Sequence, residues 1–223
     1  LKCFSRVDKN QTKDKIFHDL EIKYPTYTYT EEDLICQKPI LEIVTNKKFI
    51  EIAKNYFGSE PILKNVNMWW STNFLKEADS ESAQMFHFDL DGIKWLKIFI
   101  YITDVNIENG PHVYVSNTHK SFEKPYDLML RGYKRISDED IKSRYDSSRI
   151  KTICGKAGTT IIGDTSCFHK GLPPKKESRL IFEYELSNSL FGSPYKENFN
   201  SLSKNINFND YMEKNKNFFK KYI

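Results

Sequence analysis

The chain of 223 residues lacks a long hydrophobic run. It contains no stretch of about 18 consecutive apolar residues, the minimum for a membrane-spanning helix. It also lacks the charged-then-apolar opening of a signal segment. These absences favour a cytoplasmic protein without a membrane partner. The sequence begins at Leu1 rather than at Met, so we expect that a few residues precede it.

Cysteine is scarce as well. The four cysteines are scattered, with no Cys-x-x-Cys pair among them, and this spacing excludes a zinc-ribbon site. Few, isolated thiols are typical of a reducing compartment, in agreement with a cytoplasmic location. The residues are Cys3, Cys36, Cys154 and Cys167.

An excess of charge of one sign is also absent. The 34 Lys and Arg nearly balance the 30 Asp and Glu, for a net charge of +4. Nucleic-acid-binding domains usually concentrate basic residues in one stripe, so we expect no nucleic-acid partner. With 39% hydrophobic and 29% charged residues, the chain has a globular composition. We therefore predict a single domain over residues 1–223; the composition leaves the oligomeric state open.

The first 58 residues read as a mostly helical buttress. The clearest helix has Thr45 as its expected cap, and its apolar residues recur at helical spacing before Gly58 ends it. These apolar residues are Phe49, Ile52, Ala53, Tyr56 and Phe57.

Residues 60–187 have a different residue pattern. Short segments rich in aromatic and β-branched residues alternate with turn-prone residues. In one of them Leu96, Ile98, Ile100 and Ile102 alternate with a second set, so the apolar face should pack against helices. The second set, Lys97, Phe99 and Tyr101, should point into a barrel. The expected strands are 62–70, 85–89, 95–103, 150–154, 159–162, 167–169 and 179–187.

Many short strands indicate a sandwich or barrel. We predict a mainly β fold with flanking helices, a double-stranded β-helix or jelly-roll of the cupin type, over residues 60–187. Ser137 should cap a short helix in an insert, 122–149, which we expect to cover the pocket mouth as a lid. The tail 188–223 should contain an amphipathic helix over 209–222.

The chemically informative residues are His87, Asp89, His169 and, ten residues after the last of these, Arg179. Two imidazoles and one carboxylate form a facial triad, which holds Fe(II) and leaves positions open for a co-substrate and O2. His87 alone is as well explained by a core histidine, and Arg179 alone by a surface charge. Together and in this order, the four residues predict a metal site with an anchor for a dicarboxylate.

Three segments carry a family resemblance. They are Asn109-Gly110-Pro111 with its close at 117–120, the stretch 163–171 around the distal histidine, and the strand that begins at Arg179. Between residues 60 and 187 the chain resembles the phytanoyl-CoA dioxygenase family. It departs from the family pattern at Asn117-Thr118, where the family has Gly-Ser. It departs again at Gly171, where a hydroxyl residue is common.

The resemblance implies a function. His87, Asp89 and His169 would hold Fe(II), and Arg179 would bind the far carboxylate of 2-oxoglutarate in a bidentate pair. O2 and the co-substrate would then be consumed as the substrate is hydroxylated. Asp89 favours hydroxylation over halogenation, because related halogenases leave that position to Ala or Gly.

Further residues are assigned to the same pocket. Lys97, Tyr101 and Thr160 are expected to contact the co-substrate, with Thr160 or Tyr101 replacing the hydroxyl missing at Gly171. His112 and His119 are competing ligands that we expect to be structural or at the pocket rim. The residues expected to contact substrate are Trp70, Asn73, Phe99 and Tyr114.

The substrate itself is not specified by the sequence. The basic loop 170–178 suggests an anionic or thioester-linked molecule, such as a phosphorylated sugar. Two alternatives to an oxygenase stay open. One is a cupin-type metal enzyme without oxidation, such as an isomerase, and the other is a ligand-binding jelly-roll with a degenerate site.

Overall fold

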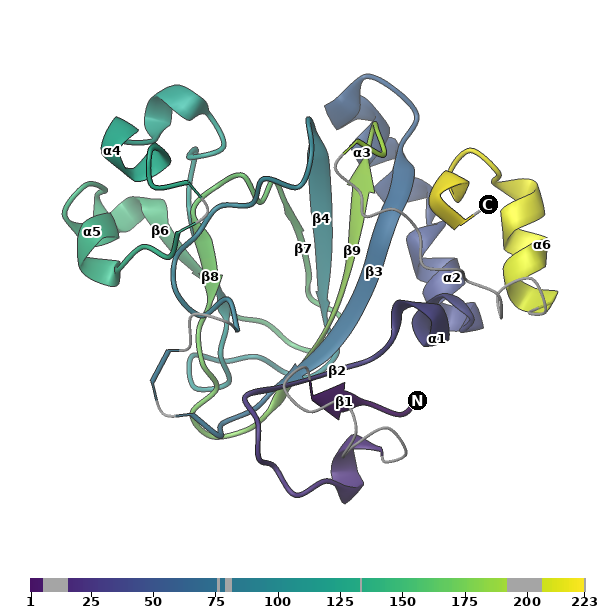
Figure 1. Cartoon of the computed structure of the whole chain (residues 1–223), viewed down its shortest axis with the longest axis horizontal. Helices are drawn as coiled ribbons and strands as arrows, with labels where there is room; N and C mark the ends of the chain where they lie inside the picture. The colour runs from purple at the N-terminus through teal and green to yellow at the C-terminus, as the bar shows by residue number, and fades with distance from the viewer. Residues whose placement is uncertain (6–15, 76, 79–81, 133, 192–205, 223) are drawn as a thin grey trace.

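The computed structural model describes residues 1–5, 16–75, 77–78, 82–132, 134–191 and 206–222. Two antiparallel sheets face one another, as the jelly-roll prediction requires (Figure 1). The larger sheet has the order β1-β2-β3-β9-β4-β7, and the smaller sheet has the order β6-β5-β8. Among the described residues, no helix is long and apolar enough to cross a membrane.

The larger sheet centres on β9, which pairs with β3 on one side and with β4 on the other. These pairings join segments that are far apart in the sequence. The sheet therefore forms only when β9, the last strand, pairs with the early strands β3 and β4. Its strands are β1 (Phe4–Ser5), β2 (Thr26–Thr28), β3 (Ile62–Ser71), β4 (Trp95–Tyr101), β7 (Thr160–Gly163) and β9 (Arg179–Ser187).

The outer face of the larger sheet carries the main hydrophobic core. Leu96, Ile98 and Ile100 lie there, as their alternation predicted, beside Phe182 and Leu186 of β9. Helices from both ends of the chain cover this face (Figure 1). They are α1 (Glu31–Ile35), α2 (Lys38–Val44), α3 (Lys47–Phe57), α6 (Ile206–Lys214) and the 3-10 turn η5 (Lys220–Tyr222).

The smaller sheet is covered by the insert. Val113 and Val115 of β5 point away from the larger sheet and pack with Leu128, Ile136 and Ile141 of the insert. The insert therefore supports the outer face of this sheet, whereas we expected a lid over the pocket mouth. The remaining elements are β5 (His112–Val115), η2 (Ser121–Glu123), α4 (Tyr126–Met129), α5 (Asp138–Lys142), η3 (Ser147–Arg149), β6 (Ile150–Ile153) and β8 (His169–Gly171).

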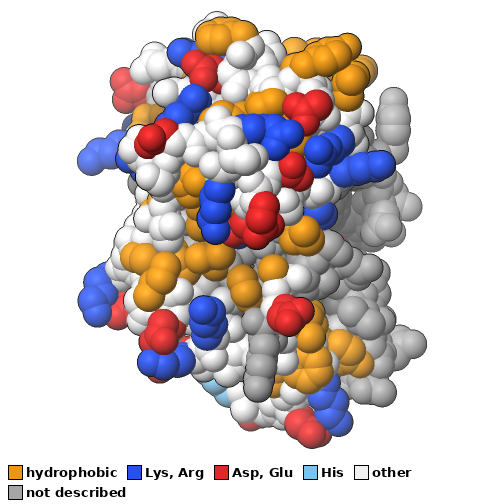
Figure 2. Space-filling view, turned by 90° about the vertical axis from the view of Figure 1, so that its left-hand side faces the viewer, with side chains coloured by type: hydrophobic (Ala, Val, Ile, Leu, Met, Phe, Trp, Pro, Cys, Tyr) orange, Lys and Arg blue, Asp and Glu red, His pale blue; other side chains and the backbone are white. Residues whose placement is uncertain are grey.

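The outside of the insert is a mixed charged surface. Figure 2, which faces this side, shows basic and acidic side chains interspersed. Arg131 and Arg144 each reach Asp140, at 2.9 and 3.1 Å, and Arg144 also reaches Asp127 at 2.8 Å. Ser137 caps α5 as predicted, because its hydroxyl accepts from the Asp140 amide at 3.0 Å.

Several boundaries differ from the predictions. The N-terminal region contains strands β1 and β2 and the 3-10 turn η1 (Phe17–Asp19), so it is less helical than expected. Asn46, not Thr45, caps α3, because its side chain accepts from the Lys48 amide while Thr45 ends α2. Residues 85–89 form only isolated bridges. The tail helix ends at Lys214, before η5, and the part of the tail over 192–205 lies outside the described residues.

Candidate metal centre

The three predicted ligands converge between the two sheets. Atoms of His87, Asp89 and His169 that can bind a metal all lie within 4.8 Å of one another, and the three residues are buried. His87 and His169 exchange backbone hydrogen bonds of 3.0 and 2.8 Å, and the Asp89 amide donates to Thr165 at 2.8 Å. Backbone pairing thus fixes the triad without help from a metal. Among the described residues, no other group of three or more His, Cys, Asp or Glu meets the same criterion.

Both imidazoles present the same nitrogen to the site. His87 Nδ1 lies 2.9 Å from the Met85 carbonyl, and His169 Nδ1 lies 2.9 Å from the Cys167 carbonyl. A carbonyl only accepts, so each Nδ1 carries the proton and each Nε2 carries the lone pair that a metal would take. Burial lowers the pKa of His87 to about 3 and also lowers the pKa of His169. The rings are therefore neutral at physiological pH, as metal ligands must be.

Lys97 holds the carboxylate ligand. Its ammonium lies 2.8 Å from Asp89 Oδ2 and 2.6 Å from Asp91 Oδ2, and a Glu185 oxygen is 3.7 Å away. Burial alone would raise the pKa of Asp89, but the adjacent His169 ring and the hydrogen-bonded Lys97 ammonium lower it to about 2. Burial would lower the pKa of Lys97, but Glu183 and the other carboxylates raise it well above its usual value. Lys97 therefore supports Asp89 and contacts carboxylates at the metal end of the site, whereas we had expected it to contact the co-substrate.

Arg179 begins β9 at the end of the pocket away from Lys97. Its guanidinium is 3% exposed, and it donates to the Gly110 carbonyl and, at 3.0 Å, to Ser71 Oγ. Burial lowers its pKa to about 10, so it stays charged. Within the described part of the chain, no carboxylate lies within ion-pair distance of it, and its Nε has no hydrogen-bond partner. A buried cation normally has a counter-charge, so this end of the pocket fits an anionic ligand.

The side chains around Arg179 leave further polar atoms unused. A Cβ built on Gly171 would lie 3.4 Å from Arg179 Nη2 and 3.7 Å from the His112 ring, so the guanidinium, His112 and strand β8 adjoin. His112 Nδ1 and the Tyr114 hydroxyl are buried and have no hydrogen-bond partner among the described residues. Burial lowers the pKa of His112 and raises that of Tyr114. Orphaned polar atoms of this kind mark space for a polar ligand.

Two of the predicted pocket residues flank the metal site. Tyr114 stacks on His169, with ring centroids 5.5 Å apart and planes at 19°. Phe99 lies on the inner face of β4, 4.6 Å from the His112 ring. Tyr101 faces inward too, but its hydroxyl accepts from the His112 amide at 3.0 Å and donates to Ile153 at 2.8 Å. It therefore shapes this end of the pocket through the backbone.

The structure places three other predicted residues elsewhere. Trp70 lies on the outer face of β3, stacked on Phe17 at 4.0 Å. Thr160 is exposed and pairs with Ile100, so it shares the outward phase of β7 and cannot replace a hydroxyl at Gly171. Asn73 is exposed beyond the end of β3 and donates to the Lys176 carbonyl at 2.9 Å. The substrate role of Trp70 and the co-substrate role of Thr160 are therefore corrected, and the substrate role of Asn73 stays a prediction.

The sequence reasoning missed several residues that shape the site. Ser71 and Gly110 orient Arg179, and Glu183 and Glu185 face the pocket from β9 between Arg179 and Ser187. The β9 pair was detectable in principle, because Glu183 and Glu185 alternate with apolar residues in the strand that begins at Arg179. The partners of Arg179 come from loops and strands distant in the sequence, and no local pattern marks them.

The basic loop is largely neutralised. Lys170 reaches Asp138 at 2.5 Å and lies 4.6 Å from the Phe86 ring centroid, on the outside of the smaller sheet. Lys176 reaches Glu108 at 2.5 Å. These pairings leave less free positive charge beside the pocket than the sequence suggested.

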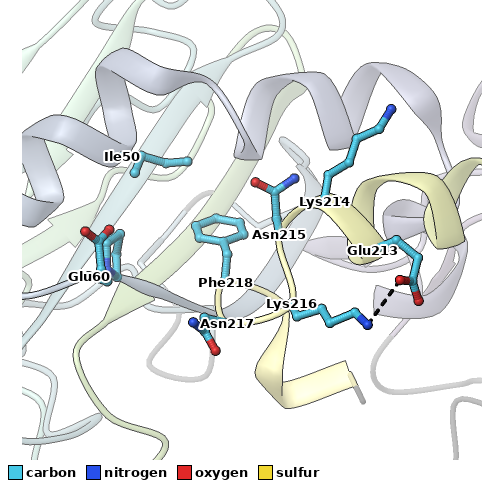
Figure 3. A pocket seen from close by; sticks show the side chains of 9 residues that line it. Ile50, Glu60, Glu213, Lys214, Asn215, Lys216, Asn217 and Phe218 are labelled. Atoms are coloured by element: carbon cyan, nitrogen blue, oxygen red, sulfur yellow. Dashed lines mark ion pairs between the residues drawn. The ribbon is translucent and has the colours of Figure 1, made fainter.

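A concave feature lies on the far side of the larger sheet. It is a hollow of about 440 Å³ between α3, the start of β3 and the segment after α6 (Figure 3). Its charged residues pair locally, with Lys216 3.1 Å from Glu213. It is separate from the triad. The residues that line it are Ile50, Glu60, Pro61, Glu213, Lys214, Asn215, Lys216, Asn217 and Phe218.

Comparison with models of known families identifies the family of this chain. The family model "Phytanoyl-CoA dioxygenase (PhyH)" matches residues 5–178. The chain belongs to the phytanoyl-CoA dioxygenase family. The match contains His87, Asp89 and His169, stops just before Arg179, and begins earlier than the resemblance we noted from residue 60. Among curated proteins, no sequence matches this family member.

Solved structures support the fold of this family member. HygX from Streptomyces hygroscopicus with nickel and 2-oxoglutarate bound superposes with a TM-score of 0.55 at 15% identity, over 76% of this chain and 72% of that chain. HygX with hygromycin B also bound has a TM-score of 0.52 at 14% identity, over 76% and 72%. SnoN, an epimerase in complex with Fe3+, alpha ketoglutarate and nogalamycin RO, has a TM-score of 0.49 at 17% identity, over 76% and 68%. The HygX similarities confirm the jelly-roll prediction.

Proposed function

We propose that the chain is an Fe(II)- and 2-oxoglutarate-dependent dioxygenase that hydroxylates a small molecule. The proposal rests chiefly on Arg179, a buried guanidinium without a carboxylate partner among the described residues, close to β8 and therefore to His169. A buried cation is costly unless an anion joins it. A dicarboxylate that binds the metal at one end would supply that anion at the other, whereas a metal enzyme without such a co-substrate has no use for Arg179.

The donor set fits iron, and the residues around it have distinct tasks. His87, His169 and Asp89 would hold Fe(II) on one face, and the bound ion supplies O2 activation coupled to decarboxylation of 2-oxoglutarate. Lys97 keeps Asp89 ionised and orients it. Phe99 and Ile181 form an apolar wall that limits water near the site.

Arg179 supplies orientation at the opposite end. Its two hydrogen bonds, to Gly110 and Ser71, fix the plane of the guanidinium, and the remaining donors are free for a bidentate pair with a carboxylate. Asp89 occupies the position that a halide would need, so hydroxylation is proposed over halogenation. The polar atoms left unused at His112 and Tyr114 lie in the same region and would contact co-substrate or substrate.

The decisive experiment is an anaerobic titration of the Fe(II)-loaded protein with 2-oxoglutarate, followed by the weak visible metal-to-ligand charge-transfer band. We expect the band in the unmodified protein. Arg179→Ala should weaken 2-oxoglutarate binding by about 2–4 kcal/mol, roughly 30- to 1,000-fold, because it removes one partner of a buried charge pair. Asp89→Ala should abolish tight iron binding.

Lys151→Ala, at an exposed lysine of β6, is the matched control and should leave the titration unchanged. The melting temperature of each apoprotein shows whether a variant is folded. Iron binding without a band would favour the non-oxidative metal enzyme. Absence of iron binding by the unmodified protein would favour a degenerate ligand-binding jelly-roll.

A further inference from the structure

The inner face of β9 carries a second buried ionisable side chain, Glu183, that has no ion-pair partner among the described residues. Glu183 is 6% exposed; its Oε1 has no hydrogen-bond partner and its Oε2 is 3.5 Å from Asn67 Nδ2, among the described residues. It lies on the same face as Arg179, four residues further along the strand, which is roughly 13 Å at about 3.3 Å per residue. The two charges are therefore too far apart to neutralise each other.

The two lysines near Glu183 already form ion pairs with other carboxylates. Lys64 pairs with Glu185 at 3.0 Å, and Lys97 pairs with Asp89 and Asp91. Asp89 is also a metal ligand. Three non-ligating carboxylates thus face two ammonium groups, and Glu183 is the one that forms no ion pair within 4.0 Å with a lysine of the described residues, although its carboxylate helps to raise the pKa of Lys97.

The residues of β3 opposite this part of β9 are only partly buried. Asn67 is directly opposite Glu183 in the β3–β9 pairing, and Trp69 is opposite Ile181. Both β3 residues are half-buried although their side chains face inward. Asn67 faces Glu183, and Trp69 packs with Phe99 and Tyr101. The protein therefore does not fill the inner face here, and a ligand could reach the Glu183 carboxylate along this row.

We infer that Glu183 is a specificity-determining residue that binds a protonated amine of the substrate. The inference rests on the proposed function, in which Arg179 at the other end of the strand binds the co-substrate. The buried guanidinium of Arg179 would then bind the anionic co-substrate, and the buried carboxylate of Glu183 would bind a cationic group of the substrate. The amide of Asn67 beside it suits a substrate that also carries hydroxyl groups.

The test uses matched probe pairs that differ only in ammonium against hydroxyl: butylammonium and butanol, cyclohexylammonium and cyclohexanol, glucosamine and glucose. Their binding to protein saturated with Ni(II) and 2-oxoglutarate is measured by calorimetry. We expect at least one ammonium probe to bind about tenfold or more tightly than its alcohol, as a buried charge pair provides. In Glu183→Gln, which keeps the shape and removes the charge, the preference should fall below about threefold.

Glu60→Gln, the same substitution in the hollow of Figure 3, is the control and should keep the preference. Equal or absent binding of every ammonium probe by the unmodified protein overturns the inference, and so does a preference that survives in Glu183→Gln. The comparison within probe pairs needs no variant, so it decides even if Glu183→Gln does not fold. Normal 2-oxoglutarate binding with no amine preference refutes this inference alone, whereas loss of 2-oxoglutarate binding by the unmodified protein refutes the proposed function.

Discussion

The two faces of β9 are both buried but contain opposite kinds of side chain. On the outer face Phe182, Tyr184 and Leu186 join the large hydrophobic core under the helices. On the inner face Arg179, Glu183 and Glu185 are ionisable and at most 6% exposed. Buried charges rarely stabilise a fold more than apolar residues of similar size would. The contrast indicates that the outer face holds the protein together and the inner face serves ligands.

The largest effect on the outer face should come from Phe182→Ala. Phe182 is fully buried, so its truncation leaves a cavity and should lower the free energy of unfolding by about 3–5 kcal/mol. The inner face does not change, so the folded fraction should bind Ni(II) with unaltered affinity. Urea unfolding and metal titration measure the two quantities. A large loss of metal affinity without unfolding would contradict the division between the faces.

A comparable loss is expected on the inner face from Lys97→Met, for a different reason. Removal of one partner from a buried charge cluster leaves uncompensated carboxylates and should cost the apoprotein about 3–5 kcal/mol. A divalent metal would replace part of the lost positive charge. Saturating Ni(II) should therefore raise the melting temperature of Lys97→Met more than that of Phe182→Ala, and an equal rise in both would argue against charge compensation.

The smallest expected effect is the loss of folding stability as the pH falls. Burial lowers the pKa of His112 well below 6.5, so unfolding takes up a proton when the pH is below about 6.5. The stability that this neutral ring contributes is present above that pH and is lost as the pH falls toward the folded-state pKa. Each such imidazole changes the unfolding free energy by at most about 1.4 kcal/mol per pH unit. The raised pKa of Glu185, about 7, opposes this trend where its carboxyl titrates.

His112→Phe isolates the contribution of one ring. The apoprotein variant should lose less stability than the unmodified protein between about pH 7 and about pH 5, measured by urea unfolding. The Glu185 effect is common to both proteins and cancels in the comparison. Parallel pH profiles would show that His112 is not buried as a neutral ring.

The convergence of the three candidate metal ligands was predictable because their signal is local and chemical. His87 and Asp89 are two residues apart and His169 lies in a family-like segment, so residue types and order were sufficient. Strand phase was predictable on β4, where Leu96, Lys97 and Ile98 alternate clearly between apolar and polar. On β3 it was not, because Trp69 and Trp70 are both apolar and nothing local shows which one faces the pocket.

The remaining errors came from contacts between distant segments. Lys97 was placed correctly on the inner face, but its partners Asp91 and Glu185 come from a loop and another strand. The insert was predicted to cover the pocket mouth, although no chemical pattern in its sequence supported that placement. In the structure they pack on the outer side of β5, which only the sheet pairing determines.

Gly110 has a consequence for how relatives of this protein are recognised. Its φ is +76°, and a Cβ there would lie 2.4 Å from the Leu172 carbonyl and 2.9 Å from Pro174 N, so any other residue would displace the loop. The same glycine supplies the carbonyl that orients Arg179. A homologue could therefore keep His87, Asp89, His169 and Arg179 and still be catalytically silent through drift at this one turn. Searches that separate active from inactive members of the family should therefore check this glycine as well as the triad.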